Sequence, residues 1–429
     1  MNNSILINDS PRFRLLDLLF VLFIVLYSGL GIYFFRSREG FFTLTFITIF
    51  FVILRRIKFN KKFIWVVFIW LSYCVLVSII FSDFSPLFIL RYVVFFAITF
   101  IFVNYYKSGF FNYYINIIYW LSIISITFWI WQIISEDSLY NFMNNYGIDT
   151  YLDRIYYRSD IIYKSIVFFT YSNYGVNYTD AVTFLPRNYA FCWEPGPAGV
   201  FIGLALLFNL FKSNFNKFLT NKNILLFLTL LTTQSSTAIL AIMIFYLYYL
   251  LKSSNLKELK FITILVYALI FVVVFFSFSI FHEKVGKQLE TVESIETIKD
   301  RSYTKDIAIS VGRFGGLLLA FDDFKKSPIL GFGDSEGETS GTLQGARVYG
   351  VNGIAGIISV YGLFGIIILF RYLYESSLYV NKLYACNVPH GYMLYLLIVY
   401  FGFSFHNLPI VFALTFISLF SSKSADSKI

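Results

Sequence analysis

The segment FLPRNYAFCWEPGPAGVFIGLAL, residues 184–206, places an arginine and a glutamate at the start of a long apolar run. An arginine guanidinium binds phosphate or carboxylate through two parallel hydrogen bonds, and a glutamate can accept a proton or orient an arginine. Arg187 and Glu194 are therefore candidates for a catalytic pair. The alternative is a helix cap with an incidental ion pair, because Pro195 and Pro197 suit a first helical turn and Glu194 suits the positive end of the helix dipole.

A third charged residue, Arg91, lies inside the apolar run PLFILRYVVFFAITFIF (86–102). Charge at such a depth in a membrane is costly, and by default it indicates a functional site. The alternative is that the side chain reaches out to the lipid headgroups. We treat Arg91 as a candidate for substrate binding.

A further segment with a candidate arginine is ISVGRFGGLLLAFDDFKKSPILGFGDSEG (309–337). In it, Arg313 begins a helix-like stretch that ends at Pro328. The glycine turn that follows lacks the strand, helix and spacing of a dinucleotide site. Asn352 begins the next apolar run as an expected N-cap. The small residues of that run predict close helix packing: Gly353, Ala355, Gly356, Gly362 and Gly365.

Histidine and cysteine give no metal or disulfide pattern. His282, His390 and His406 are scattered, and Cys74, Cys192 and Cys386 all lie on or beside apolar runs. No spacing resembles a zinc site, so we expect neither a metal nor a cofactor. His406, in FSFHNLP, stays a candidate for substrate binding because the expected topology places it at the outer side.

Composition excludes an ordinary soluble domain, since 58% of the 429 residues are hydrophobic, 14% are charged and the mean hydropathy is +0.70. Apolar runs able to cross about 30 Å of hydrocarbon recur along nearly the whole chain. The sequence predicts an all-α polytopic bundle of about twelve spans, near 15–35, 40–54, 63–81, 86–104, 111–134, 192–211, 222–233, 236–251, 260–281, 352–374, 389–404 and 408–420.

Lysine and arginine predict the orientation. If both ends are cytoplasmic, the inner segments collect nearly all basic residues, including RRIKFNKK (55–62), and the short outer turns hold only Arg36 and Arg38. The net charge of +9 then faces anionic lipid, and no nucleic-acid partner is needed. The predicted organisation is N-terminal helices (1–134), a first large outer loop (135–188), central helices (189–281), a second large outer loop (282–351) and C-terminal helices (352–429).

The order of these pieces resembles the bacterial O-antigen polymerase (Wzy) and O-antigen ligase superfamily of membrane glycosyltransferases. The shared features are R-x(6)-EP-G at a mid-chain span, a polar TTQSS bend (232–236), GR followed by SP-x-L-G-x-G in the large outer loop, and NG with YG-x-x-G in the next span. The resemblance covers residues 187–369 in detail and the remainder as topology only.

The resemblance implies a multi-pass protein of the bacterial inner membrane that polymerises oligosaccharide units on undecaprenyl diphosphate at the periplasmic face. The family's essential arginines in two periplasmic loops fall on Arg187 and Arg313, with Glu194 as a base or an orienter. Arg301 with Gly312 matches a further arginine–glycine spacing, and Arg91, Asn352 and His406 complete the expected substrate site. The sequence leaves open whether a chain-length regulator protein binds.

Two alternatives remain. In ligases of this superfamily a functional histidine lies where the large loop re-enters the membrane, and this chain has Val351 there, which favours the polymerase. A flippase or exporter of the lipid-linked unit would also present arginines to a diphosphate. Such a transporter should expose charged residues to both sides, whereas the candidates here gather at the outer face.

Overall fold

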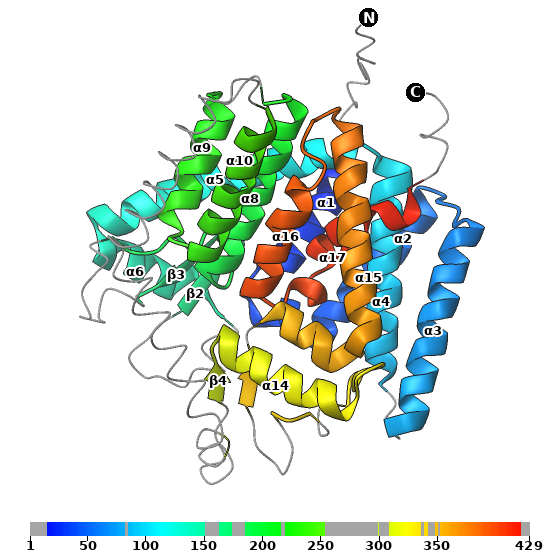
Figure 1. Ribbon diagram of the computed structural model, residues 1–429. Coiled ribbons are helices and arrows are strands. Elements are labelled where there is room, and N and C mark those ends of the chain that lie inside the picture. Colours follow the sequence, from blue (N-terminus) through cyan, green and yellow to red (C-terminus); the bar gives the residue numbers. More distant parts are fainter. Residues whose placement is uncertain are drawn as a thin grey trace, which may run out of the picture.

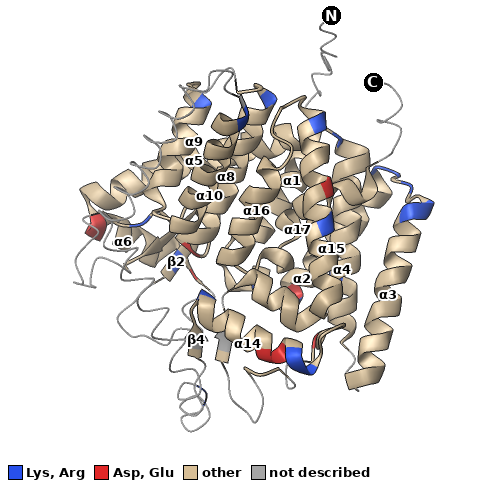
Figure 2. Cartoon of the chain, in the orientation of Figure 1, with Lys and Arg blue, Asp and Glu red and all other residues tan. Residues whose placement is uncertain are grey.

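The computed structural model describes residues 15–81, 85–150, 163–173, 185–215, 219–253, 299, 309–335, 339–341, 348–350 and 352–421. These residues are mostly helical and form a bundle with both chain termini at one end (Figure 1). Lys and Arg gather at that same end (Figure 2). It is the end that the charge pattern assigns to the cytoplasm.

Five of the described helices are long and apolar enough to cross a membrane, as an all-α membrane protein requires: Lys61–Phe81, Pro86–Tyr106, Gly109–Ile134, Pro195–Lys212 and Gly353–Leu383. Three shorter apolar helices occupy other predicted spans: Leu15–Gly29, Ser236–Lys252 and Gly391–Gly402. The predicted span 260–281 lies outside the described residues. The count of about twelve spans and the orientation stay predictions.

The N-terminal part of the bundle extends from Leu15 to Ile134. Its elements are α1 (Leu15–Gly29), the 3-10 turn η1 (Tyr33–Arg36), α2 (Arg38–Leu54), α3 (Lys61–Phe81), α4 (Pro86–Phe100), the π-helical turn η2 (Ile101–Tyr106) and α5 (Gly109–Ile134). Ser37 and Ser85 cap α2 and α4, because each hydroxyl accepts a backbone N–H of the first turn. Asp17 of α1 is buried and pairs with Arg55 at 2.7 Å, which ties α1 to the end of α2.

A small lobe follows α5, and it departs from the purely helical expectation. It consists of α6 (Glu136–Tyr146) and a three-stranded antiparallel sheet of β1 (Ile148–Asp149), β2 (Tyr163–Ile166) and β3 (Phe169–Ser172). Leu139, Met143, Phe169 and Tyr171 form its own apolar core. These strands are too short to leave an alternating pattern that a sequence reading would detect.

Helix α8 (Pro195–Lys212) lies in the interior of the bundle. Nearly all its residues are buried, and α5, α9 (Asn221–Thr232) and α10 (Ser236–Ser253) pack against it. Tyr395 of α16 (Gly391–Gly402) donates to the carbonyl of Val200 within it. Gly199 permits this packing, because a Cβ there would lie 2.8 Å from Ser235 Cβ. A helix this enclosed has little freedom to shift, so the residues at its N-terminus are held firmly.

The last part of the described chain closes the end of the bundle opposite the termini. Its elements are β4 (Ile309–Val311), α14 (Arg313–Lys326), β5 (Val348–Gly350), α15 (Gly353–Leu383), α16 (Gly391–Gly402), η5 (Phe405–Asn407), α17 (Pro409–Thr415) and η6 (Ile417–Phe420). Helix α14 lies across that end (Figure 1), and β4 pairs in parallel with β5.

The glycine turn after α14 docks into a break in α15. Gly362 has φ +57° inside α15, and the backbone N–H groups of Leu363 and Phe364 donate to the carbonyls of Pro328 and Ile329. In return Phe332 and Gly333 donate to carbonyls of α15. The two glycine motifs are therefore partners in one backbone junction.

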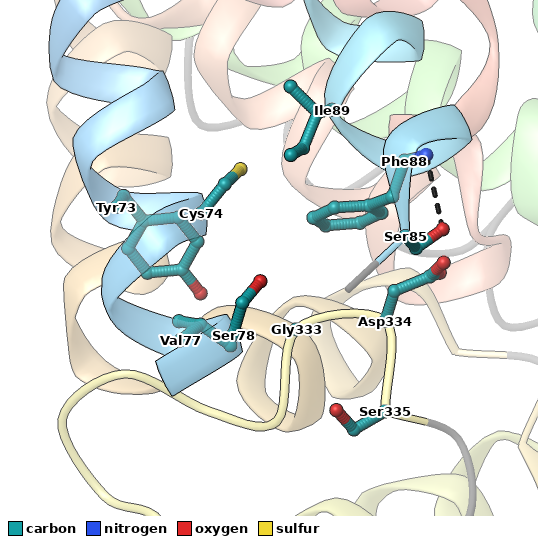
Figure 3. A pocket seen from close by; sticks show the side chains of 10 residues that line it. All are labelled: Tyr73, Cys74, Val77, Ser78, Ser85, Phe88, Ile89, Gly333, Asp334 and Ser335. Atoms are coloured by element: carbon teal, nitrogen blue, oxygen red, sulfur yellow. Dashed lines mark hydrogen bonds between the residues drawn. The ribbon is translucent and has the colours of Figure 1, made fainter. Parts of the chain in front are cut away.

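The same turn also contacts α3 and α4. Figure 3 shows Asp334 and Ser335 of the turn beside Ser78 of α3 and Ser85 of α4, around a small polar cleft. The Tyr73 hydroxyl, from α3, donates to the carbonyl of Leu330 at 2.7 Å. The half of α3 nearer Phe81 is thus fastened to the loop that enters α15.

Candidate active site

Glu194 is the centre of the site. It occupies the N-cap position of α8, with Pro195 at the first helical position as the sequence predicts, yet its side chain accepts no hydrogen bond from the helix. Its charge interacts instead with Arg187, Arg36 and Arg313. Burial raises the pKa of the Glu194 carboxyl, and the three guanidinium groups act against that rise. Glu194 thus has the N-cap position that the helix-cap alternative predicts, without a capping hydrogen bond from its side chain.

Arg187 is held by the polar bend between α9 and α10. Its Nε donates to the carbonyl of Thr233 at 3.4 Å and its Nη2 to that of Gln234 at 3.3 Å. The bend offers these carbonyls because Gln234 has φ +50°, which interrupts the helical hydrogen bonding. The TTQSST bend thus has a defined role, which is to orient Arg187.

The loop that carries Arg187 is fixed on both sides. Asn188 is buried and receives a hydrogen bond from Ser125 of α5 at 2.7 Å, while its backbone N–H donates to the carbonyl of Thr232 at 2.9 Å. Trp129 of α5 donates to the carbonyl of Pro186 at 2.7 Å. Because each neighbour of Arg187 is fastened to a helix, the guanidinium is pre-organised.

Arg313 reaches the same place from the other loop. As the first residue of α14, it donates through Nε to the carbonyl of Gly402 at 3.2 Å, and its guanidinium lies 5.6 Å from the centre of the Phe403 ring. Burial lowers the pKa of Arg313, and Glu194 opposes that change. An arginine still remains protonated under physiological conditions, so the positive charge persists.

Phe403 connects Arg313 to Glu194. A Cβ at Gly196, two residues beyond Glu194, would lie 1.9 Å from Cζ of Phe403. Only glycine at that position lets the ring lie against the first turn of α8. The EP-G motif therefore combines a carboxylate, a helix start and room for the ring that supports Arg313.

Arg36 is the functional candidate that the sequence reading missed. It lies in η1, its guanidinium is 4.0 Å from the centre of the Trp193 ring, and it donates to the carbonyl of Ser28 at 3.4 Å. Trp193 immediately precedes Glu194, and its backbone N–H donates to Gly29. The available signal was charge, because Arg36 is one of two basic residues in the outer turns where the topology rule expects few.

The other residues predicted to bind substrate are Asn352, Arg91, His406 and Arg301. Asn352 caps α15 through Ala355 N–H, as expected, and its amide donates to the carbonyl of Arg313 at 3.4 Å, so it joins the starts of α15 and α14. Arg91 and His406 form a separate pair, because Arg91 influences His406 but does not contribute to the surroundings of Glu194. Arg301 lies outside the described residues, as does Val351.

The arrangement suits anion binding. Three arginines around one carboxylate leave an excess of positive charge at the N-terminus of a helix, where the backbone also favours anions. The described residues contain no group of three or more His, Cys, Asp or Glu side chains that could hold a metal ion. No family model matches this sequence, and a search of curated proteins finds no relative.

Proposed function

We propose that this chain is a membrane glycosyltransferase that polymerises undecaprenyl-diphosphate-linked oligosaccharide units into O-antigen or a similar surface polysaccharide. It acts at the periplasmic face of the bacterial inner membrane. The observation that carries the proposal is that Arg36, Arg187 and Arg313, from three separate segments, all lie within electrostatic range of Glu194 at the start of α8. The order of the motifs, which resembles that of O-antigen polymerases, supports the choice of substrate.

The chemistry follows from the charges. A sugar hydroxyl of one lipid-linked unit attacks the anomeric carbon of a second chain, a new glycosidic bond forms, and the bond from that carbon to the diphosphate breaks. The arginines stabilise the negative charge of the departing diphosphate through bidentate hydrogen bonds. Glu194 takes the hydroxyl proton, and its raised pKa makes it a better base than an exposed glutamate.

The site also fits the physical form of such a substrate. Its arginines lie where apolar helices end, so a lipid diphosphate can bind there with its tail in hydrocarbon and its sugars in water.

The test is a set of single replacements in a strain that lacks the native gene, with surface polysaccharide separated on a gel. Arg187→Ala, Glu194→Ala and Arg313→Ala should collapse the ladder to a single repeat attached to the lipid A core, at equal membrane levels of protein. Lys325→Ala, on the exposed face of the same helix as Arg313, is the matched control and should leave the ladder unchanged.

Other outcomes would contradict the proposal. Long chains that persist on the lipid carrier without reaching the core would identify a ligase. Lipid-linked units that stay on the cytoplasmic side would identify an exporter. An unchanged ladder in all three variants would mean that the charged residues only anchor helices.

A further inference from the structure

An open groove lies between α3, α4, α15 and α17, away from the arginine cluster. Its lining is apolar apart from tyrosine hydroxyls and one indole N–H, and it includes Ile69, Trp70, Tyr92, Phe364, Ile368 and Phe412. From Ile357 to Tyr372 the lining follows α15 over a rise of roughly 22 Å. The groove therefore runs along the bundle for much of the thickness of a bilayer core.

Helix α3 forms the outer wall of the groove and is loosely held. It stands at the edge of the bundle (Figure 1) and packs chiefly on α4. Near the middle of α3, Trp70 donates to the carbonyl of Ile89, and Tyr73 donates to that of Leu330. Ile64 and Trp65 near one end of the helix and Ile79 near the other are more than 60% exposed, so one face of α3 meets the hydrocarbon of the membrane.

A cation lies next to one end of the groove, outside its lining. Tyr92 and Tyr361 line the groove with their rings 6.0 Å apart, and the Tyr361 ring lies 6.4 Å from that of His406. Arg91 directly precedes Tyr92 and, within the described part of the chain, has neither a hydrogen bond nor an ion pair. His406 is 8% exposed, and among the same residues its Nδ1 has no hydrogen-bond partner.

His406 is neutral near pH 7, since burial and then the charge of Arg91 lower its pKa to about 4. A neutral imidazole can donate one hydrogen bond beside the permanent charge of Arg91. Neither side chain lines the groove itself, but each adjoins a lining residue at the same end, Arg91 next to Tyr92 in the chain and His406 against the Tyr361 ring. An apolar groove with these two groups just beyond one end matches a long hydrocarbon chain with an anionic phosphate at one end.

We propose that this groove binds the polyprenyl chain of the lipid carrier, with its phosphate end at Arg91 and His406. The inference rests on the proposed function, and it adds a second lipid position besides the cluster around Glu194. A single methyl-branched chain can lie between the bulky rings of the groove, whereas a phospholipid presents two chains side by side. A polymerase needs two lipid-linked substrates at once, one as donor and one as acceptor.

The test uses a polyprenyl phosphate that carries a photoreactive diazirine in its chain and no sugar. The full chain is reconstituted in nanodiscs of phosphatidylethanolamine and phosphatidylglycerol, and the labelled peptides are mapped after illumination. Labelling should fall on α3, α4 and α15, and undecaprenyl phosphate should compete for it while added phosphatidylglycerol does not.

Two neighbouring residues of α15 give a matched pair of variants. Ile368 lines the groove, whereas Ile367 is 58% exposed and does not line it. Ile368→Trp should fill the groove and lower labelling at least fivefold, and Ile367→Trp should leave it unchanged. Arg91→Ala should weaken labelling about tenfold, which corresponds to the loss of one charge-assisted hydrogen bond.

The outcomes separate this inference from the proposed function. Equal labelling in the two tryptophan variants, or full competition by phosphatidylglycerol, would overturn the groove assignment. If labelling behaves as expected but the protein does not join lipid-linked repeats, the groove assignment stands and the polymerase assignment fails.

Discussion

Gly196→Ala tests whether the contact between α8 and Phe403 sets the position of Arg313. The added Cβ would lie 1.9 Å from Cζ of Phe403, whereas ordinary contacts begin near 3.4 Å. The ring must therefore move by about 1.5 Å. The guanidinium of Arg313 lies over that ring and its Nε binds the adjacent Gly402, so we expect the displaced ring to shift Arg313 relative to Glu194.

A displacement of this size is large for catalysis. A misplacement of about 1 Å can cost roughly a hundredfold in rate, or close to 2.7 kcal/mol of barrier. We therefore expect purified Gly196→Ala to extend lipid-linked repeats about a hundredfold more slowly than wild type, with an unchanged amount of folded protein. The assay counts the repeats added over time, with no acceptor other than the lipid-linked unit.

Two further variants make this prediction sharp. Gly109→Ala is the matched control, because a Cβ there meets no atom within 4 Å, and it should retain the wild-type rate. Phe403→Leu combined with Gly196→Ala should recover most of the lost rate, since the smaller side chain leaves room for the methyl group. A wild-type rate for Gly196→Ala alone would refute the link between this contact and Arg313.

Three other predictions test separate parts of the structure. Glu194→Gln should slow polymerisation by a factor of about 10² to 10⁴. It should also abolish the fall in rate at acid pH, which in the wild type reflects protonation of Glu194 with a pKa that burial raises. If the fall at acid pH remains, it belongs to another group. Asp17→Ala leaves Arg55 without its ion-pair partner and should lower the free energy of unfolding by about 3 kcal/mol, measured as a lower thermal midpoint. Adding Arg55→Leu should restore part of that stability. An unchanged midpoint in Asp17→Ala would show that the ion pair does not stabilise the fold. Gly362→Ala should lower the free energy of unfolding by at least the cost of a strained residue, about 2 kcal/mol, because φ is +57° and the added Cβ would lie 2.7 Å from Gly331 N. Stability equal to that of Gly109→Ala would contradict the close backbone contact between α15 and the turn after α14.

The sequence predicted the elements that depend on local composition. The long apolar runs appear as helices α3, α5, α8 and α15, and the prolines after Glu194 mark the start of α8. Charge in an apolar setting drew attention to Arg187, Glu194 and Arg313, and the fold brings these three within electrostatic range of one another. The energetic cost of burying a charged side chain is visible from the apolar residues beside it in the chain, so a single sequence can reveal it.

What the sequence could not predict depends on contacts between distant segments. The break at Gly362 is stabilised by hydrogen bonds to the turn after α14, and without that turn the run reads as one uninterrupted helix. For this reason the sequence predicts only close helix packing for Gly362 and assigns no partner to the glycine turn at 331–333. Arg36 joins the site only because η1 lies against Trp193, a contact between residues far apart in the chain.

The short segment from the end of α16 through η5 connects the two proposed lipid positions. At one end, the carbonyl of Gly402 receives the hydrogen bond of Arg313, and Phe403 lies against the first turn of α8. At the other, His406 lies beside Gly356 of α15 and close to Arg91, at the cationic end of the groove. Four residues thus fix the offset between the arginine cluster and the groove. Because glycosyl transfer needs the acceptor hydroxyl and the donor's anomeric carbon in contact, a rigid offset between two lipid sites would itself contribute to the rate.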